Sequence, residues 1–281
     1  MPILHLLLVA VIQGLTEFLP ISSSGHLILL PNLSGLQDQG LTIDVAVHVG
    51  TLGAVILFFW RDVRMALVGT GRLLRGKVDT QGAFLALCLA VATVPVVILG
   101  LAIKLAGVEE MLRSTALIGW TMLLFGIVLY WADRTGPESR SARDWSLKHA
   151  LQMGLWQVLA LIPGTSRSGI TITAGRMLGY GRAEAVRLAM LMSIPTILAS
   201  GLVLGAEVAM DADAAVARDA AIAAVFAFLA ALFALWAMVR LLRVVSFTPY
   251  VIYRVILGLI LLWIAYSPEA AAAAPALQPL G

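Results

Sequence analysis

Two short polar segments of this sequence carry the side chains that could do chemistry. The first runs from Gln13 to His26 and holds a glutamine, a glutamate, three consecutive serines and a histidine. The second runs from Pro163 to Thr171 and holds hydroxyl side chains on both sides of a single arginine. Both lie between apolar stretches, where polar groups are costly, so each is a functional hypothesis by default.

The first segment supplies an acid, a hydroxyl and an imidazole. Gln13 and Glu17 are four residues apart, so they lie on one face of a helix. A carboxylate and an imidazole beside a serine are the parts of a nucleophile-and-base mechanism. We therefore expect Ser23 or a water molecule to attack a phosphorus atom, and Glu17 or His26 to handle the proton. The alternative for His26 is a helix cap or a packing contact.

A helix break in the same segment predicts an anion site. Pro20 interrupts the first helix, and the serines after it stand where a second helix would start. Hydroxyl groups cap such a start, and the free backbone N–H groups there bind phosphate. The residues expected to contact the substrate here are Gln13, Ser22, Ser24 and Gly25.

The second segment adds the cation that the first one lacks. Arg167 has no basic neighbour within the segment and no adjacent acid. A fixed guanidinium with hydroxyls beside it is suited to phosphate oxygens in a dry site. We therefore predict a catalytic role for Arg167 in offsetting developing charge. The expected substrate contacts of this segment are Gly164, Thr165, Ser166, Ser168 and Thr171.

The two segments are related by an offset of 144 residues without a gap. This offset is about half of the 281 residues, so we expect a first repeat over 1–147 and a second over 148–281. The two repeats supply different chemical groups, because Ser23 of the first repeat stands at the position of Arg167 in the second. The matched pairs include Gln13 with Gln157, Ser22 with Ser166, Ser24 with Ser168, and Gly25 with Gly169.

The composition of the chain is that of an integral membrane protein. It is 60% hydrophobic and only 12% charged, against roughly 25% charged residues in soluble domains. The basic pI of about 9.3 is not a nucleic-acid signal here, because most of the 19 Lys and Arg residues fall in four short connections. Short basic loops set the orientation of membrane proteins.

The apolar stretches predict an all-α polytopic membrane protein. Six stretches approach the roughly 20 residues that a spanning helix needs, namely 43–60, 82–105, 115–132, 183–206, 220–242 and 250–266. Regions 2–31 and 148–180 are apolar at both ends but broken in the middle, so neither arm is long enough to span. Such breaks are typical of re-entrant helix pairs that line a polar cavity. We expect six spanning helices and two re-entrant pairs in one membrane domain.

The charges of the connections predict an inverted-topology repeat. An odd number of spans per half, three, inverts the second half relative to the first. Basic residues gather in the connections 61–79, 133–148, 176–187 and 240–249, whereas the alternate connections carry acids such as Glu109 and Glu110. Because basic loops stay in the cytoplasm, both termini are expected outside. Arg254, near a span end, is expected to extend its charge to the membrane interface.

The two segments together resemble the undecaprenyl-diphosphate phosphatases of the BacA/UppP type. That family has a Glu or Gln followed after three residues by Glu, a histidine, and a Pro-Gly-x-Ser-Arg-Ser-x-x-Thr box. Gln13, Glu17 and His26 match the first part, and the box matches from Pro163 to Thr171. The family's first box often opens with Glu, so Gln13 removes one charge and leaves Glu17 as the acid of the box.

The resemblance implies an activity and its setting. It implies hydrolysis of undecaprenyl diphosphate to undecaprenyl phosphate and inorganic phosphate, which recycles the lipid carrier of peptidoglycan synthesis and confers bacitracin resistance. It implies a divalent cation, Mg²⁺ or Ca²⁺, for which Glu17 and Gln13 are the candidate ligands. The expected location is the bacterial cytoplasmic (inner) membrane, with the active site open to the periplasmic face. The expected partners are a long-chain prenyl diphosphate and the membrane, with no nucleic acid, and a homodimer is an open option.

Two other functions agree with the same pattern. Broken helices that meet inside an inverted repeat are also typical of secondary transporters, so the chain could be a lipid-phosphate flippase or an anion transporter. Serine-rich breaks can also serve helix packing alone. Phosphate release by purified protein in detergent separates the enzyme from the transporter, because no transport occurs there.

Overall fold

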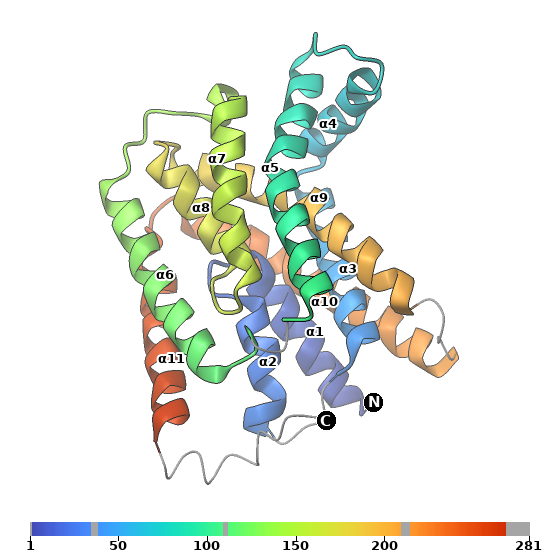
Figure 1. Ribbon diagram of the computed structural model, residues 1–281, viewed down its shortest axis with the longest axis vertical. Coiled ribbons are helices and arrows are strands. Elements are labelled where there is room, and N and C mark those ends of the chain that lie inside the picture. Colours follow the sequence, from blue (N-terminus) through green and yellow to red (C-terminus); the bar gives the residue numbers. More distant parts are fainter. Residues whose placement is uncertain (1, 35–38, 109–111, 209–213, 268–281) are drawn as a thin grey trace.

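The computed structural model describes residues 2–34, 39–108, 112–208 and 214–267, and these form a bundle of helices (Figure 1). The predicted acidic pair Glu109 and Glu110 and the tail after residue 267 lie outside the described residues. The helices are α1 (Ile3–Phe18), α2 (Ser23–Ser34), α3 (Leu41–Phe58), α4 (Trp60–Leu73), α5 (Gln81–Ala106), α6 (Thr115–Thr135), η2 (Ala142–Asp144), α7 (Leu147–Val158), η3 (Leu159–Leu161), α8 (Arg167–Met177), α9 (Arg182–Val208), α10 (Ala214–Leu241) and α11 (Thr248–Tyr266).

Six described helices are long and apolar enough to cross a membrane, and they agree with the six predicted stretches within a few residues. They are α3, α5, α6 and α11 over their whole lengths, α9 over Arg182–Leu204, and α10 over Val216–Leu241. The agreement follows from hydropathy, because a segment that must satisfy its backbone inside lipid forms a helix whatever its neighbours are.

The predicted connection 61–79 is wrong in one respect, because most of it is the helix α4. Its buried residues include Asp62, Val63, Ala66 and Gly69, which recur at helical spacing. A side-chain carbon on Gly69 would lie 2.0 Å from the carbonyl carbon of Gly82, so α4 and the start of α5 are in backbone contact. The amphipathic pattern was hidden by the basic residues on its other face.

Four short helices form two pairs, each interrupted by a few non-helical residues. α1 and α2 are joined by 19–22, and α7 and α8 by η3 and the residues up to 166. Figure 1 shows α1 and α2 in the lower half of the view and α7 and α8 in the upper half, with the two breaks between them. Each helix of a pair has at most 16 residues, so none spans a bilayer core of about 30 Å by itself.

In each half of the chain, the first helix of the broken pair packs on a spanning helix of the other half. α1 packs on α10 in the other half, and α7 packs on α5. Both contacts are close because of a glycine. A side-chain carbon on Gly14 would lie 2.6 Å from the carbonyl oxygen of Ala227, and one on Gly154 would lie 2.4 Å from that of Ala92. Small residues of this kind let helix backbones approach within a membrane.

The four basic connections meet at one end of the molecule, as their charges predicted. Buried Asp133 accepts hydrogen bonds from Arg176 at 3.2 Å, from Arg182 at 2.7 Å and from the backbone N–H of Phe247 at 3.3 Å. Those groups belong to three of the connections. The fourth joins through α4, where Asp62 pairs with Arg187.

Candidate active site

The first helix break presents Glu17 at the end of α1. The helix ends at Phe18, and Leu19 is extended, because Pro20 disfavours the helical conformation in the residue before it. Glu17 is buried, and its Oε2 accepts a hydrogen bond from Gln13 Nε2 at 2.8 Å. The predicted spacing of four residues is therefore confirmed as a contact along one helix face.

The second break repeats the geometry of the first. Ser22 and Ser166 have φ values of 72° and 71°, and among the described residues no other non-glycine residue has a positive φ. Each hydroxyl accepts a hydrogen bond from the backbone N–H three residues later, that of Gly25 at 3.3 Å and that of Gly169 at 3.1 Å. Residues held in this unfavourable region cluster at functional sites. The sequence offset of 144 residues thus coincides with a repeated local structure.

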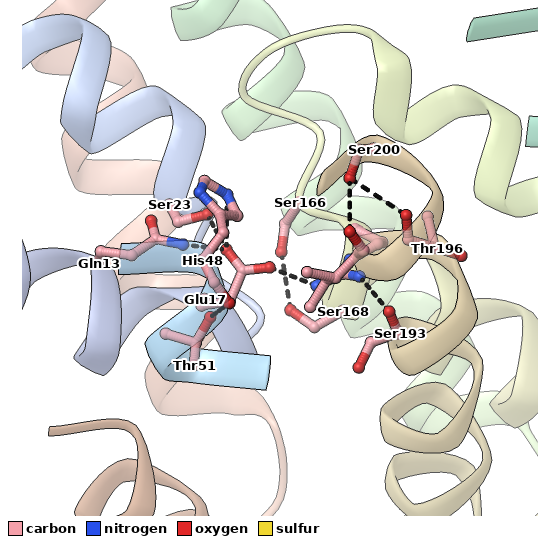
Figure 2. A network of polar contacts seen from close by, with 12 residues as sticks. Gln13, Glu17, Ser23, His48, Thr51, Ser166, Ser168, Ser193, Thr196 and Ser200 are labelled. Carbon is pink, nitrogen blue, oxygen red and sulfur yellow. Dashed lines mark hydrogen bonds and ion pairs between the residues drawn. The ribbon is translucent and has the colours of Figure 1, made fainter. Parts of the chain in front are cut away.

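The two breaks contact each other directly. Arg167 begins α8, and its Nη2 forms an ion pair with Glu17 Oε1. Figure 2 shows Glu17 of the first break close to Ser166 and Ser168 of the second. Arg167 Nη1 also donates to the carbonyl oxygen of Ser193 on α9 at 3.0 Å. The hydroxyl of Ser168 donates to the carbonyl oxygen of Leu19 at 2.9 Å. The predicted acid and the predicted cation therefore form one composite site, with each half of the chain supplying one of them.

Ser23 has the geometry of a nucleophile next to its base. Its hydroxyl donates to Glu17 Oε2 at 2.6 Å, inside the range of about 2.6 to 3.2 Å expected for such a pair. Glu17 is itself oriented by Gln13 and Arg167. The helices α2 and α8 both begin at this site, at Ser23 and Arg167, and helix N-termini attract phosphate groups.

The remaining predicted substrate contacts line the two breaks. The hydroxyls of Ser22 and Ser24 lie 3.3 Å apart, and those of Ser166 and Ser168 lie 3.2 Å apart. The hydroxyl of Thr171 donates to the carbonyl oxygen of Arg167 at 2.8 Å, so it braces the helix start. Gly164 has a φ of 86°, and Gly25, in the first turn of α2, donates its backbone N–H to the Ser22 hydroxyl.

Two polar atoms of the site lack a partner among the described groups. They are Thr165 Oγ1 and Gln13 Oε1, and both are buried. Buried polar groups are nearly always satisfied in native proteins. These two atoms are therefore the first candidates for contact with a bound ligand.

His26 makes its hydrogen bonds away from the Glu17 cluster. Its Nδ1 lies 2.6 Å from the carbonyl oxygen of Ser22, and its Nε2 lies 2.5 Å from the hydroxyl of Tyr253 on α11. The two rings stack with centroids 5.7 Å apart. The catalytic role predicted for His26 stays a prediction, since the structure joins this residue to the start of α2 and to α11.

His48 lies beside the site, although it was not among the predicted site residues, because a structural role was favoured for it. Its Nε2 lies 3.9 Å from Glu17 Oε2, and its Nδ1 lies 2.7 Å from the carbonyl oxygen of Asp44. It also lines a cavity of about 350 Å³ between α3 and α9, whose other lining residues are mostly apolar. A histidine inside an otherwise apolar span was the available signal.

The prediction for Arg254 is wrong, because its side chain is fully buried instead of reaching the interface. Its five N–H donors all meet backbone carbonyl oxygens at 2.9 to 3.3 Å. Those oxygens belong to Pro20 in the first break, to Gly164 and Thr165 in the second, and to Thr121 and Met122 on α6. The arginine therefore binds both breaks together.

The donor set at Glu17 fits a cation only if the substrate supplies further ligands. Among the described residues, no group of three or more His, Cys, Asp or Glu side chains could hold a metal ion. The oxygens at the predicted position are the unpartnered Gln13 Oε1 and those of Glu17, which already accept from Gln13, Ser23 and Arg167. Mg²⁺ is commonly bound by one or two carboxylates together with substrate phosphates, and this set meets that minimum.

Comparison with known proteins places the chain in one family along nearly all of its length. Residues 6–260 match the family model described as "Bacitracin resistance protein BacA". A relative from Dinoroseobacter shibae, named undecaprenyl-diphosphatase, is 71% identical over 267 residues, which cover 95% of this chain and 100% of the relative. Relatives of the same name from Roseobacter denitrificans and Chromohalobacter salexigens are 70% and 44% identical, with 95% and 93% of this chain and 100% and 99% of the relatives covered.

Proposed function

The chain belongs to the bacitracin resistance protein BacA family, and we propose that the composite site of Glu17, Ser23 and Arg167 is where it cleaves its substrate. The chain is an enzyme that hydrolyses undecaprenyl diphosphate to undecaprenyl phosphate and inorganic phosphate. This reaction recycles the lipid carrier of peptidoglycan synthesis and confers bacitracin resistance. The observation that carries the assignment is the Ser23 hydroxyl at 2.6 Å from a carboxylate whose other oxygen pairs with Arg167.

The geometry supports a two-step displacement at the terminal phosphorus. Ser23 Oγ attacks that phosphorus, its proton passes to Glu17, and the anhydride P–O bond breaks with undecaprenyl phosphate as the leaving group. Water then attacks the phosphoserine, releases inorganic phosphate and restores the serine hydroxyl. Glu17 is favoured over His26 as the proton acceptor, because the Ser23 hydrogen bond leads to Glu17. In the alternative mechanism, a water molecule held by Ser23 attacks the terminal phosphorus directly.

Arg167 and the two helix starts hold the diphosphate. The guanidinium supplies a fixed positive charge, and the N–H groups at the starts of α2 and α8 supply partial charges of about +0.5 each. In a site that excludes water, such donors stabilise the charge that grows on the phosphoryl oxygens. Thr165 and Gln13, with their unpartnered oxygens, are the groups that remain to contact the substrate or its cation.

Glu17 and Gln13 are the residues that would hold the divalent cation, Mg²⁺ or Ca²⁺, together with oxygens of the diphosphate. When bound, the cation would neutralise diphosphate charge and polarise the bond that breaks. The orphaned Gln13 Oε1 in the site supports this assignment. A titration with chelator, followed by the return of Mg²⁺ or Ca²⁺, distinguishes the two metals by the rate of phosphate release.

The prenyl chain follows the cavity between α3 and α9. This cavity of about 350 Å³ is lined by apolar side chains such as Leu52 and Ile197 and includes His48, which faces Glu17. An apolar groove that ends beside the diphosphate site suits a lipid whose head group reacts. Replacing Leu52 by tryptophan should raise the KM for undecaprenyl diphosphate more than that for farnesyl diphosphate, whose chain is shorter.

We place the pair α1–α2 as re-entrant from the outside and the pair α7–α8 as re-entrant from the cytoplasm of a bacterial inner membrane. This arrangement makes the two halves an inverted repeat with both termini outside and the site open to the periplasm. Three observations support it: the matched breaks, the corresponding contacts of α1 with α10 and of α7 with α5, and the basic residues gathered at one end of the bundle. Cysteine accessibility at residue 275 tests it, since labelling only from the cytoplasmic side contradicts this topology.

Phosphate release by the purified protein in detergent tests the function itself. Wild-type protein should release phosphate from undecaprenyl and farnesyl diphosphates, and Glu17→Ala should abolish this release. The absence of release from any prenyl diphosphate would favour the flippase or anion transporter instead. Mass photometry of the same sample tests whether the protein is a homodimer.

A further inference from the structure

We propose that the basic end of the bundle holds a second ligand site, for a phosphate-bearing lipid head group. A cavity of about 560 Å³ lies there between α4, α5, η2 and α9. None of the residues that line it belongs to the Glu17–Arg167 site. Figure 1 shows α4 and the adjoining part of α5 at the upper end of the view, above the helix breaks.

The charged side chains of this cavity leave positive charge without compensation. Three arginines and one aspartate line it. Arg187 is paired, since it donates to both carboxylate oxygens of Asp62 at 3.0 and 2.5 Å and lies 3.7 Å from Glu184. Arg61 and Arg143 form no hydrogen bond or ion pair within the described part of the chain. The two free guanidinium groups match the charge of a phosphate monoester, which is about −1.5 to −2.

A buried hydrogen-bond donor at the same cavity independently points to a ligand. Trp145 lines the cavity and is only 4% exposed, and its indole N–H has no hydrogen-bond partner among the described groups. A buried N–H without an acceptor is unusual in a folded protein. Trp145 can only donate, as can the two arginines, so all three groups call for a ligand rich in acceptor oxygens.

The rest of the wall indicates that the ligand is amphipathic. The lining includes Phe84 and Leu85 of α5 together with Leu188 and Leu191 of α9, of which the two α9 leucines are buried. Phe84 is 37% exposed, so its ring is the apolar surface that an occupant can cover. A free phosphate ion would leave it uncovered, whereas an acyl or prenyl chain would cover it. The combination favours a lipid phosphate over inorganic phosphate.

Native mass spectrometry of the detergent-purified protein tests this site with a matched pair of double variants. Arg61→Gln with Arg143→Gln removes the two free charges of the cavity. Arg64→Gln with Arg75→Gln removes the same charge from exposed positions of the connection 61–79 that do not line the cavity. With lysophosphatidic acid as the probe, the first pair should weaken binding about 30-fold, and the second pair should leave it unchanged. Trp145→Phe should weaken it severalfold by removing only the N–H.

The number of bound ligands separates this site from the site of hydrolysis. Wild-type protein should bind two molecules of lysophosphatidic acid, Arg167→Ala should lose one, and the Arg61/Arg143 double variant should lose the other while it still releases phosphate. Equal binding by wild type and that double variant would overturn the site. Equal binding of inorganic phosphate would overturn the lipid assignment, and equal binding of mono-oleoylglycerol would overturn the role of the phosphate.

Discussion

Removing the charge of Glu17 or of Arg167 should destabilise the fold, and removing both should restore part of the loss. The two side chains are only 6% and 15% exposed. Removing one partner of a buried ion pair leaves the other charge unpaired, which destabilises by about 3 to 5 kcal/mol. Glu17→Gln and Arg167→Met should each lose this much stability. Their combination should lose less than the sum, by about 1 to 3 kcal/mol.

Hydrolysis should respond differently from stability in the same four proteins. Loss of one charged donor at the transition state lowers kcat by about 10² to 10³, so both single variants should be slow. The double variant should remain slow, because it lacks both the carboxylate that accepts the proton and the positive charge that holds the diphosphate. Arg167→Lys keeps the charge but cannot reach both Glu17 and the Ser193 carbonyl oxygen, so it should recover stability more than rate.

Two measurements on each variant check this reasoning. Unfolding in mixed micelles of increasing SDS fraction, followed by circular dichroism, gives the stability differences, and phosphate release from farnesyl diphosphate gives the rates. Strict additivity of the two stability losses would show that the ion pair is absent from the folded protein. A wild-type rate for Arg167→Met would remove Arg167 from the active site. Recovery of rate in the double variant would mean that the two charges serve only to neutralise each other.

Three further predictions concern the nucleophile, the metal and the packing of α1. Ser23→Ala should lower kcat without loss of stability, and rapid-quench labelling should show phosphoserine in wild type only; a wild-type rate would rule out Ser23 as the nucleophile. Chelation should reduce phosphate release and added Mg²⁺ or Ca²⁺ should restore it, whereas full activity in excess chelator would remove the cation from the mechanism. Gly14→Ala should destabilise by about 1 to 3 kcal/mol, since the new carbon would lie 2.5 Å from Ala230 Cβ. The control Gly71→Ala, with nothing within 4 Å, should not.

The spans and the helix breaks were predictable because their signals are local. A long apolar stretch forms a helix inside lipid whatever lies beside it, and the ends of α3 and α5 fall within two residues of the predicted limits. The contact of Glu17 with Arg167 followed from the repeat, because matched breaks in two halves are expected to meet. The α4 helix was missed because its basic residues dominate the pattern of a short segment.

The partners supplied by distant backbone could not be predicted. Arg254 binds carbonyl oxygens that are free only because the helices break at Pro20 and Gly164, and sequence types do not reveal which carbonyls a fold leaves free. His26 and Tyr253 meet across 227 residues, and no spacing rule links them. His48 reaches Glu17 through the packing of α3 beside α1, a tertiary contact that hydropathy does not encode.

The place of Arg254 in the chain sets the order in which the site can be completed during synthesis. Pro20 and Gly164 leave the ribosome long before the arginine that binds their carbonyl oxygens. Until α11 enters the membrane, both breaks hold unpaired carbonyl groups, and each such group in lipid costs several kcal/mol. The halves can already join through Glu17 and Arg167, but their breaks gain the hydrogen bonds of Arg254 only when α11, the last described helix, arrives.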